Sequence, residues 1–473
     1  MSQYNEAKQH SQNYIEQVCE QVRWKKAHPI VQEELLAHIE DQAEAYREEG
    51  YEADDAEYLA VEQMGDPILA GSQFDKVYRP RVEWNVLLLA GSIILLGTVL
   101  RLTLQIASGV PVDWGTEIIK IFAALPFLVL GYSLDYTALL SGKTSKIFVF
   151  IVVILTILLK DIVQIAGNNL VNYTIPLWVL LFIMTVYAMR GKETTGFLLA
   201  FAEIIAMLLI FAVLYKTTIP GILVWLGSTF IITLYALKKN WFRCSKKLGF
   251  LFAVCPIILS GFVIGHPHRI DRIKYMLNPG VDSFGYGYVP SQISEIMKNA
   301  SFLGSGGVNL AYLTEHLPNM HTDYILTTAL SYWGWLSILV ILLSYGIFFT
   351  LCFMACKKVK SQMGRFVIVA ITSCWVLQFV SYLIINFTTL QMSTYPLLFV
   401  QGGYMRMINL FLLGIVMSVY KTGAVQKDAE PKTKTSVDSF YSERNLAQIR
   451  KSDQQIKEGR VIVKTMDELE ALE

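Results

Sequence analysis

Ten long apolar stretches constrain the fold of this chain more than any other feature of its sequence. They lie near residues 85–106, 115–134, 147–165, 172–189, 194–215, 218–237, 248–265, 324–352, 366–386 and 394–420. A helix needs about 20 apolar residues to cross a bilayer, so each stretch predicts one membrane-spanning helix. We expect an all-α fold: a polytopic membrane protein with about ten transmembrane helices.

Charge is scarce in the apolar region and concentrated at the two ends of the chain. Residues 83–420 hold only 34 charged side chains, whereas residues 1–82 hold 17 acidic and 8 basic residues and residues 421–473 hold ten of each. Only 17% of the whole chain is charged, against about 25% in soluble proteins. A plain soluble enzyme is therefore excluded, and a membrane domain is expected at 83–420 between two polar segments.

The basic residues of the short connecting loops predict the orientation. Thirteen Lys and Arg residues fall in the loops on one side of the predicted membrane, and only Lys160 and Lys216 fall in those on the other side. Loops rich in Lys and Arg remain in the cytoplasm, so both termini are expected there. The first residues, MSQYNEAKQH, lack the basic and apolar pattern of a cleavable signal peptide.

The two polar ends predict different structures. After Pro29 apolar residues repeat at helical spacing, and a second amphipathic run, 53–64, ends at Gly65-Asp66-Pro67, a helix-stop signal. Residues 1–82 are therefore expected to form a small cytoplasmic helical domain. Its segment AHPIVQEELLAHIEDQAEAYREEGYEADDAEYLAVEQMGDP resembles the helical prefix domains that precede bacterial membrane permeases. The cytoplasmic tail at 421–473 is rich in Lys, Gln, Asp and Ser, which predicts disorder.

One connection between the predicted spans is long. Residues 266–323 are expected to form a large extracellular loop, and loops of this length are usually functional or disordered. An amphipathic run from Ser291 places Ile293 and Ile296 on one face, which suits a helix lying in the membrane interface. Histidines at four positions in the loop could ligate a metal, but plain polar roles are favoured, and no Cys or His spacing indicates a metal site. These histidines are His266, His268, His316 and His321.

The loop and the stretch after it resemble a known family. The loop sequence RIDRIKYMLNPGVDSFGYGYVPSQISEIMKNASFLGSGG is similar to the large extracellular loop of the SEDS family, the RodA/FtsW/SpoVE polytopic membrane proteins. The following LPNMHTDYILTTALSYWGWLSILVILL resembles that family's "LPEaHTDFIFAvigEElG", and PLLFVQGG at 396–403 resembles its "LPFiSYGGS". The resemblance covers roughly residues 83–420.

The resemblance implies a peptidoglycan glycosyltransferase. Such an enzyme polymerises lipid II, the undecaprenyl-pyrophosphate-linked precursor, at the outer face of a bacterial cytoplasmic membrane during elongation, division or sporulation. It implies a class B penicillin-binding protein transpeptidase as a partner, together with membrane lipids. It implies no certain cofactor and leaves a divalent cation open. Nothing in the sequence indicates nucleic acid.

The same resemblance suggests the site residues. A sugar hydroxyl loses a proton as it attacks, so a carboxylate is needed as general base, and Asp323 of the HTD triplet is the expected catalytic residue. A pyrophosphate leaving group needs positive charge. The expected substrate-binding residues are Arg269, Arg272, Lys298, His321, Thr322, Gly402 and Gly403. No metal ligand is assigned.

Each of these roles has a structural alternative. Asp323 could cap the helix that follows it, and the loop arginines could contact lipid headgroups. Arg101 and Arg406 lie close enough to the ends of their spans to extend towards the membrane surface. Glu203 lies in mid-span and therefore needs an internal partner.

Some elements of the family pattern differ in this chain. The paired glutamates after HTD are replaced by Ser331 and Tyr332, and the element "RW…QPSE..K" has no counterpart between residues 150 and 200. A second function therefore stays open: a non-catalytic membrane scaffold or regulator, or a transporter of the lipid-linked precursor.

Overall fold

The structure is a computed structural model in which most of the membrane domain and the N-terminal segment are described. The described residues are 2–80, 82–112, 114–140, 143–162, 164–165, 168–169, 171–214, 218–242, 287–307, 310–317, 320–359, 361–388, 395–400 and 403–422, with residues 249–250, 254–256, 258, 261, 274, 278 and 285 between them. Most of the predicted span at 248–265 and of the predicted tail at 421–473 lies outside these residues.

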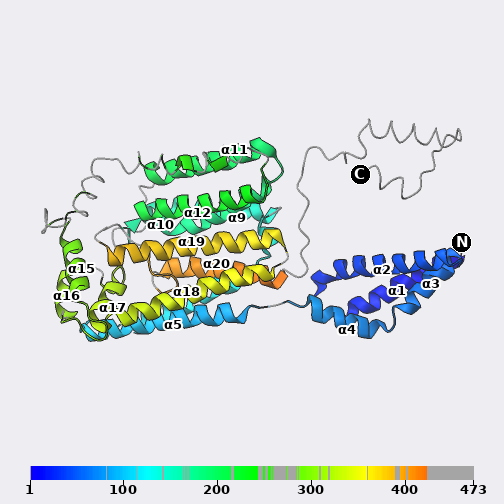
Figure 1. Cartoon of the computed structure of the whole chain (residues 1–473), viewed down its shortest axis with the longest axis horizontal. Helices are drawn as coiled ribbons and strands as arrows, with labels where there is room; N and C mark the ends of the chain where they lie inside the picture. Colours follow the sequence, from blue (N-terminus) through cyan, green and yellow to red (C-terminus); the bar gives the residue numbers. More distant parts are fainter. Residues whose placement is uncertain are drawn as a thin grey trace, which may run out of the picture.

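The first 80 residues form a unit of four helices with its own apolar core (Figure 1). These are α1 (Ser2–Gln21), α2 (His28–Glu48), α3 (Ala53–Gln63) and α4 (Pro67–Tyr78), with the short 3-10 helix η1 (Lys25–Ala27) before α2. The helices predicted after Pro29 and over 53–64 are confirmed as α2 and α3. The sequence analysis did not predict α1 and α4.

Polar contacts fix α4 to the end of α1 and stabilise the first turn of α4. The Arg23 guanidinium donates to Asp75 of α4 from Nε at 3.1 Å and from Nη2 at 2.8 Å, so the end of α1 is tied to α4. Asp66 is the N-cap of α4, where its carboxylate accepts from the Ile68 N–H at 2.9 Å. The segment Gly65-Asp66-Pro67 thus ends one helix and starts the next, because Asp is a good N-cap and Pro suits the first helical turn.

The rest of the described chain is a bundle of long apolar helices that lie roughly side by side (Figure 1). Its elements are α5 (Trp84–Ala107), α6 (Trp114–Phe122), α7 (Leu125–Ser133), α8 (Tyr136–Leu140), α9 (Lys143–Ile162), the strands β1 (Gln164–Ile165) and β2 (Asn168–Asn169), α10 (Val171–Ala188), α11 (Glu193–Leu209), the π-helical turn η2 (Ile210–Leu214), α12 (Ile219–Lys238), α15 (Tyr288–Asn299), α16 (Leu310–His316), α17 (Ile325–Trp333), α18 (Trp335–Lys358), α19 (Gln362–Phe387) and α20 (Gly403–Thr422). Strands β1 and β2 pair antiparallel in a two-residue hairpin.

Eight helical segments of the described residues are long and apolar enough to cross a membrane. They match eight of the ten predicted spans, with α6 and α7 counted as one segment. The third predicted span, 147–165, falls on α9, whose apolar part is the shorter Ser145–Leu158. A multi-pass, all-α membrane protein is therefore confirmed, while the number of ten spans stays a prediction.

Two predicted spans are broken helices. The second is divided into α6 and α7 by a turn before Pro126, which occupies the first turn of α7. The eighth, predicted as one helix over 324–352, is divided at Gly334 into α17 and α18. Gly334 has φ +78°, and a Cβ there would lie 2.5 Å from the Ser301 carbonyl oxygen, so only glycine fits this break. Helix α17 is consequently a separate buried segment under the loop.

The helices of the long loop pack on the bundle at one end, which we call the loop end. The amphipathic run predicted from Ser291 is confirmed as α15, and Ile293 and Ile296 are buried. These residues belong to the main core, and α15 contacts α17 and α19. The apolar face thus packs on protein, and the prediction that it rests in the membrane interface is wrong. The four-helix N-terminal unit lies at the opposite end of the bundle (Figure 1).

Helices α7 and α20 approach each other closely through two glycines. A Cβ on Gly131 would lie 2.2 Å from the Phe411 carbonyl oxygen, and one on Gly414 would lie 2.3 Å from that of Leu128. In membranes, small residues allow such close helix approach, which provides much of the packing energy.

We predict that Gly414→Ala lowers the thermal unfolding temperature of the detergent-solubilised protein. The added methyl group forces α7 and α20 apart, and overpacking of this kind costs about 1–3 kcal/mol. Gly91→Ala is the matched control, because no atom lies within 4 Å of a Cβ at that helical glycine of α5. An unchanged unfolding temperature for Gly414→Ala would contradict the close packing of these helices.

Candidate active site

The segment His321-Thr322-Asp323 lies in a turn at the loop end, immediately before α17. We call residues 320–324 the HTD turn. Its backbone carbonyls are held from two helices. Tyr382 of α19 donates to the Thr322 carbonyl at 2.9 Å, and Asn386 of α19 donates from Nδ2 to the Asp323 carbonyl at 3.0 Å. The Thr328 hydroxyl of α17 reaches the carbonyls of Met320 and Tyr324 at 3.1 and 2.9 Å.

Asn386 connects this turn to α17 as well as to α19. Its side-chain Oδ1 accepts from the Thr327 backbone N–H at 3.1 Å, while its own backbone carbonyl accepts from the Thr327 hydroxyl at 2.8 Å. Asn386 and Thr327 are both completely buried. Because buried, satisfied polar networks of this kind hold their members in one arrangement, the HTD turn has a fixed position relative to α17 and α19.

The Asp323 carboxylate lies between the ends of several helices. It is half-buried, and it interacts electrostatically with Tyr173 at the start of α10 and with Tyr382 of α19. The N-cap position of α17 is occupied by Tyr324. Asp323 therefore lies one residue before the N-cap of α17, and the alternative in which Asp323 itself is the N-cap residue is wrong.

A charged cluster lies at the same end of the bundle, on membrane-spanning helices. We define it as Arg101 of α5, Glu117 and Lys120 of α6, and Arg406 of α20. The Glu117 carboxylate pairs with Arg101 through Oε2 and with Lys120 Nζ through Oε1 at 2.9 Å. The Arg101 and Glu117 side chains are only 12% and 11% exposed, while that of Lys120 is 45% exposed.

Arg406 is the most deeply buried member of the cluster, with 4% of its surface exposed. Its Nη2 donates to the Val400 carbonyl. Among the described residues, its Nε and Nη1 have no hydrogen-bond partner. Val400 in turn packs on α5, since a Cβ on Gly97 would overlap the Val400 side chain. Gly97 lies one helical turn from Arg101, so the start of α20 is held beside the charged part of α5.

The HTD turn and the charged cluster are joined through His321. Its Nε2 lies 3.1 Å from the Ser108 hydroxyl, one residue beyond the end of α5. Burial, and then the nearby positive charge of Arg101, lower the pKa of His321 from its usual value. Arg101 also interacts electrostatically with Arg406. These contacts bring α5, α6, α20 and the HTD turn together in one site.

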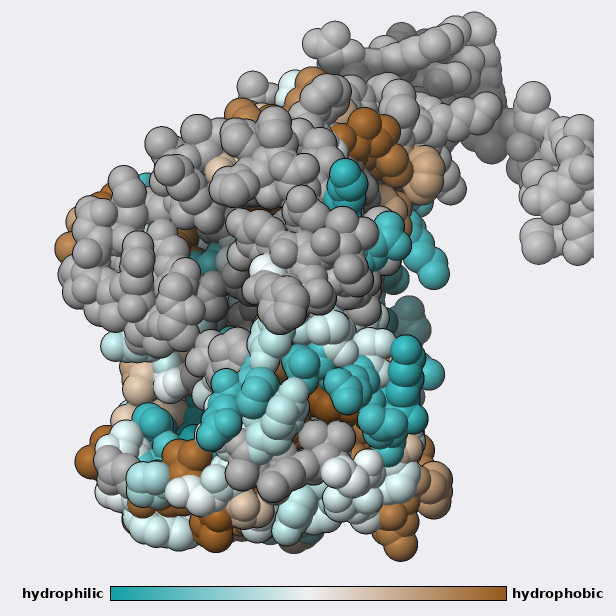
Figure 2. Space-filling model, turned by 90° about the vertical axis from the view of Figure 1, so that its left-hand side faces the viewer, coloured by the Kyte–Doolittle hydropathy of each residue, from teal (hydrophilic) through white to brown (hydrophobic). Residues whose placement is uncertain are grey.

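The site combines a carboxylate with an excess of positive charge. Arg101, Lys120 and Arg406 outnumber Glu117, which leaves the cluster with a net charge of +2 on four side chains. Figure 2 faces the loop end, and hydrophilic residues gather across the middle of this surface between hydrophobic ones. The excess of positive charge can bind an anion at this end of the bundle. The Asp323 carboxylate lies two residues from His321, which feels the charge of Arg101, and a carboxylate can act as a base.

Comparison with known proteins identifies the family. The profile of the FtsW/RodA/SpoVE family, described as cell cycle proteins, matches residues 84–424. The chain belongs to this family. A probable peptidoglycan glycosyltransferase FtsW of Thiomicrospira cyclica is 28% identical over 187 residues, which are 37% of this chain and 47% of that protein. One from Enterococcus hirae is 26% identical over 235 residues, 46% of this chain and 57% of that protein. The matched region thus spans about half the length of these curated relatives.

A solved structure has the same fold. It is a chain from work on structural coordination of polymerization and crosslinking by a peptidoglycan synthase complex. The two chains superpose with a TM-score of 0.54 at 19% identity, covering 72% of this chain and 98% of that one. The likeness supports the polytopic membrane fold of the FtsW/RodA/SpoVE family for this chain.

The predicted site residues do not all lie together. His321, Thr322 and Asp323 share the HTD turn, where Thr322 is exposed, and Gly403 is the first residue of α20. Lys298 lies elsewhere, on an open groove of about 430 Å³ between α15 and the end of α19, with Met297, Phe387 and Thr388 among its neighbours. Three further predicted residues lie outside the described ranges: Arg269, Arg272 and Gly402.

The sequence analysis missed Glu117 and Lys120. They have the Glu-x-x-Lys spacing of the family's "QPSE..K" element, which had been sought only between residues 150 and 200. Two charges three residues apart inside a predicted span were the available signal, because ionisable residues in membrane helices are functional candidates by default. The prediction that Arg101 and Arg406 extend to the membrane surface is wrong, since Arg101 pairs with Glu117 and Arg406 is buried.

The remaining candidates contribute little to this site. His316 stacks on Tyr312, with ring centroids 3.8 Å apart, and hydrogen-bonds the Tyr312 carbonyl. Glu203 lies beside the Thr185 side chain of α10, which gives it a polar neighbour inside the bundle. In the part of the chain that the structure describes, no three His, Cys, Asp or Glu side chains converge on a possible metal site.

We predict that His321 titrates below its ordinary pKa of about 6.5. The folded protein favours the neutral ring of His321. The contribution of this residue to the free energy of unfolding is therefore fully present above pH ~6.5 and is lost as the pH falls below that value. Histidine NMR, with His321→Gln for assignment, measures the midpoint. Arg101→Gln should raise this midpoint only in part, because burial is the larger cause.

The control for this titration is Arg190→Gln, at the far end of α10. It removes an arginine that stacks on Tyr187 and should leave the His321 midpoint unchanged. A midpoint at or above about 6.5 in the unmodified protein would contradict the environment described for His321.

Proposed function

We propose that this protein is a peptidoglycan glycosyltransferase that polymerises lipid II. The observation that carries the proposal is the HTD turn, which holds Asp323 two residues from His321, where the positive charge of Arg101 is felt. The family membership and the names of the curated relatives support the same function. A carboxylate next to an anion site is what glycosyl transfer from a pyrophosphate carrier requires.

In this reaction Asp323 is the general base. A sugar hydroxyl of one lipid-linked molecule attacks the anomeric carbon of the other, and its proton passes to the Asp323 carboxylate. The new glycosidic C–O bond forms as the bond from the anomeric carbon to the pyrophosphate oxygen breaks. The hydrogen bonds from Tyr382 and Asn386 to the turn fix the backbone that carries this carboxylate, which favours a constant reach to the hydroxyl.

The charged cluster stabilises the departing pyrophosphate. Its half-exposed member, Lys120, is the most accessible cation, while Arg101 and Arg406 supply positive charge from a setting of low dielectric constant. Glu117 holds Arg101 and Lys120 in place through its two carboxylate oxygens. These cations add to the predicted phosphate contacts Arg269 and Arg272, which lie outside the described residues, while Lys298 lies on a separate groove.

An apolar groove beside the same part of α5 suits the polyprenyl chain of the substrate. The groove has a volume of about 480 Å³ and lies between α5 and α18, with Leu303 and Trp333 at the loop end. Leu96, Val99 and Val340 in its walls are exposed, as expected of side chains that face lipid. Leu100 of the groove and Arg101 of the cluster are adjacent on α5, so chain and headgroup would be held by one helix.

The setting of the reaction follows from the charge of the loops. We place both termini in the cytoplasm of a bacterium and the loop end at the outer face of its cytoplasmic membrane, because the Lys- and Arg-rich loops lie at the other end. A class B penicillin-binding protein transpeptidase is the proposed partner. The solved relative supports it, since that structure concerns a complex that coordinates polymerization and crosslinking.

A non-catalytic scaffold is the alternative. It rests on Ser331 and Tyr332, which replace the paired glutamates of the family pattern. Ser331 is buried at 1% exposure in α17, so this position has no ionisable group near the HTD turn. The two functions differ in their need for the Asp323 carboxylate.

We predict that Asp323→Asn abolishes polymerisation without loss of folding. Asparagine keeps the size of the side chain but removes the base, and losing general-base catalysis typically lowers the rate by a factor of about 10² to 10⁴. The measurement is polymer formed from purified lipid II, alone and with candidate transpeptidases. Asp323→Glu should keep a small residual rate.

Glu295→Gln provides the matched control. Glu295 is an exposed carboxylate on α15, and its loss should leave the polymerisation rate unchanged. Wild-type polymerisation by Asp323→Asn at a normal expression level would reject the catalytic role and favour the scaffold.

A further inference from the structure

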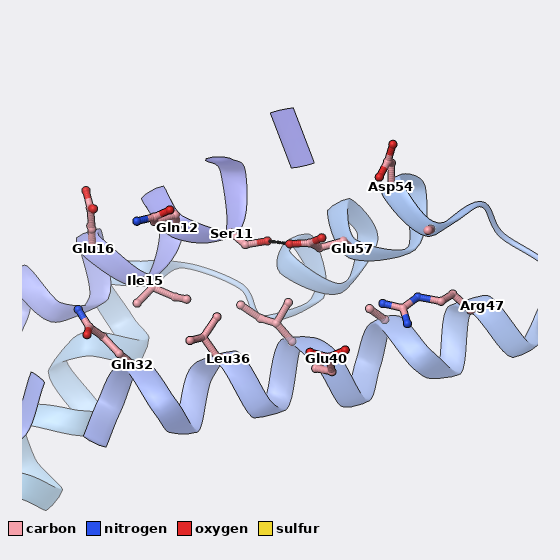
Figure 3. Close-up of a pocket in the computed structure, with 13 residues that line it drawn as sticks. Ser11, Gln12, Ile15, Glu16, Gln32, Leu36, Glu40, Arg47, Asp54 and Glu57 are labelled. Carbon is pink, nitrogen blue, oxygen red and sulfur yellow. Dashed lines mark hydrogen bonds between the residues drawn. The ribbon is translucent and has the colours of Figure 1, made fainter. Parts of the chain in front are cut away.

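The N-terminal unit contains a groove that the proposed function does not use. It has a volume of about 540 Å³ and lies between α1, α2 and the start of α3 (Figure 3). The side chains of Ile15 and Leu36 meet across its floor. Leu36 is 54% exposed, so the groove offers an accessible apolar side chain next to the buried Ile15 and Ile39.

The walls of the groove are acidic. Glu16 of α1, Glu40 of α2, and Asp54 and Glu57 of α3 line it, with Arg47 as the basic residue among the lining side chains. Glu57 accepts a hydrogen bond from the Ser11 hydroxyl at 2.6 Å, and Figure 3 shows this contact between α1 and α3. An apolar floor between carboxylates suits an amphipathic segment that carries basic residues next to its apolar face.

The end of α20 lies next to this unit. Near that end, Ser418 donates to the Leu134 carbonyl at 2.5 Å. The neighbouring residue, Asp135, forms a 2.8 Å ion pair with Lys26 of the N-terminal unit. The chain therefore leaves α20 at Thr422 beside the four-helix unit, at the same end of the bundle (Figure 1), and 51 further residues follow in the sequence.

The 51 residues after Thr422 contain a segment that carries both apolar and basic side chains. Residues 444–464 hold six basic and two acidic side chains, whereas the last nine residues hold four acidic and no basic ones. At 100° per residue, Leu446, Ile449 and Ile456 fall on one side of a helical wheel with Asp453 between them, and Arg450 and Lys457 are adjacent. This pattern complements an apolar floor between acidic walls.

The lengths also agree. A helix over 444–457 would be about 20 Å long, and the groove follows α2 from Gln32 to Arg47, about 22 Å at 1.5 Å per residue. The 22 residues from Thr422 to Arg444 can extend to about 70 Å. The whole of α2 is only about 32 Å long, so the segment can reach the groove within one molecule.

We propose that residues 444–457 of the tail dock into this groove of the N-terminal unit in the same chain. The two polar ends of the protein, which the sequence separates by more than 300 residues, then form one intramolecular complex at the foot of the membrane domain. The contact links the tail that follows α20 to α1 and α2. Salt weakens it, because much of its attraction comes from solvent-exposed charges.

Photo-crosslinking of the full chain tests this proposal. Gln12, which lines the groove, is replaced by p-benzoylphenylalanine, and the protein is placed in phosphatidylcholine nanodiscs with one chain per disc. After illumination, mass spectrometry should find adducts on peptides from 444–464. The charge reversal Glu16→Lys/Glu40→Lys should lower their yield by roughly threefold to tenfold, and Arg450→Glu/Lys457→Glu added to it should restore the yield.

The matched control is Glu20→Lys/Glu44→Lys. It makes the same charge change on exposed residues of the same two helices outside the groove and should leave the yield unchanged. Equal losses in both double variants would overturn the proposal. So would adducts that appear only with two chains per disc, which would assign the groove to a second copy. Absence of tail adducts in all discs would also overturn it and would leave the membrane surface or another protein as the partner of the basic segment.

Discussion

The ion pair between Arg101 and Glu117 is the constraint on which the site depends. A charged side chain on a membrane helix is costly unless it is paired or lines a polar cavity, and these two side chains are almost fully buried. Their pairing fixes α6 against α5, and Lys120 follows because it shares the same carboxylate. The start of α20 joins them through Val400, which packs on α5 and accepts a hydrogen bond from Arg406. Breaking one of these contacts would leave an uncompensated buried charge, so the cluster behaves as a unit.

A second set of contacts brings the catalytic candidate to this cluster. The chain must turn sharply at Gly334 for α17 to form a separate buried helix under the loop. That separate helix supplies Thr327 and Thr328, which together with Tyr382 and Asn386 of α19 hold the HTD turn. The polar groups of the turn are satisfied by protein, which is required of irregular backbone near membrane depth. The geometry around Asp323 therefore depends on residues far from it in sequence.

The sequence predicted the architecture well because its main signal is local. Apolar stretches of about 20 residues indicate spans without any knowledge of packing, and α5, α10, α12 and α19 begin and end close to the predicted residues. The HTD triplet was found because its context resembles a family pattern. The breaks before Pro126 and at Gly334 were missed, since an apolar window averages over a single turn.

The charged cluster could be predicted only in part for a related reason. Arg101 and Arg406 were noticed, but their partners depend on how α5, α6 and α20 meet, which no local pattern contains. Glu117 and Lys120 were overlooked within an otherwise apolar segment. The exposure of Leu36 could have been predicted from the helical repeat of α2, because Gln32, Glu33 and Glu40 lie three or four residues from it.

The most direct test of the central claim is a cryo-electron microscopy structure of the protein with undecaprenyl pyrophosphate bound. Our account predicts diphosphate density in contact with Lys120 and close to Arg101 and Arg406, below the Asp323 carboxylate, with the polyprenyl chain in the groove between α5 and α18. Diphosphate density on α15 near Lys298, with no density at the charged cluster, would contradict it.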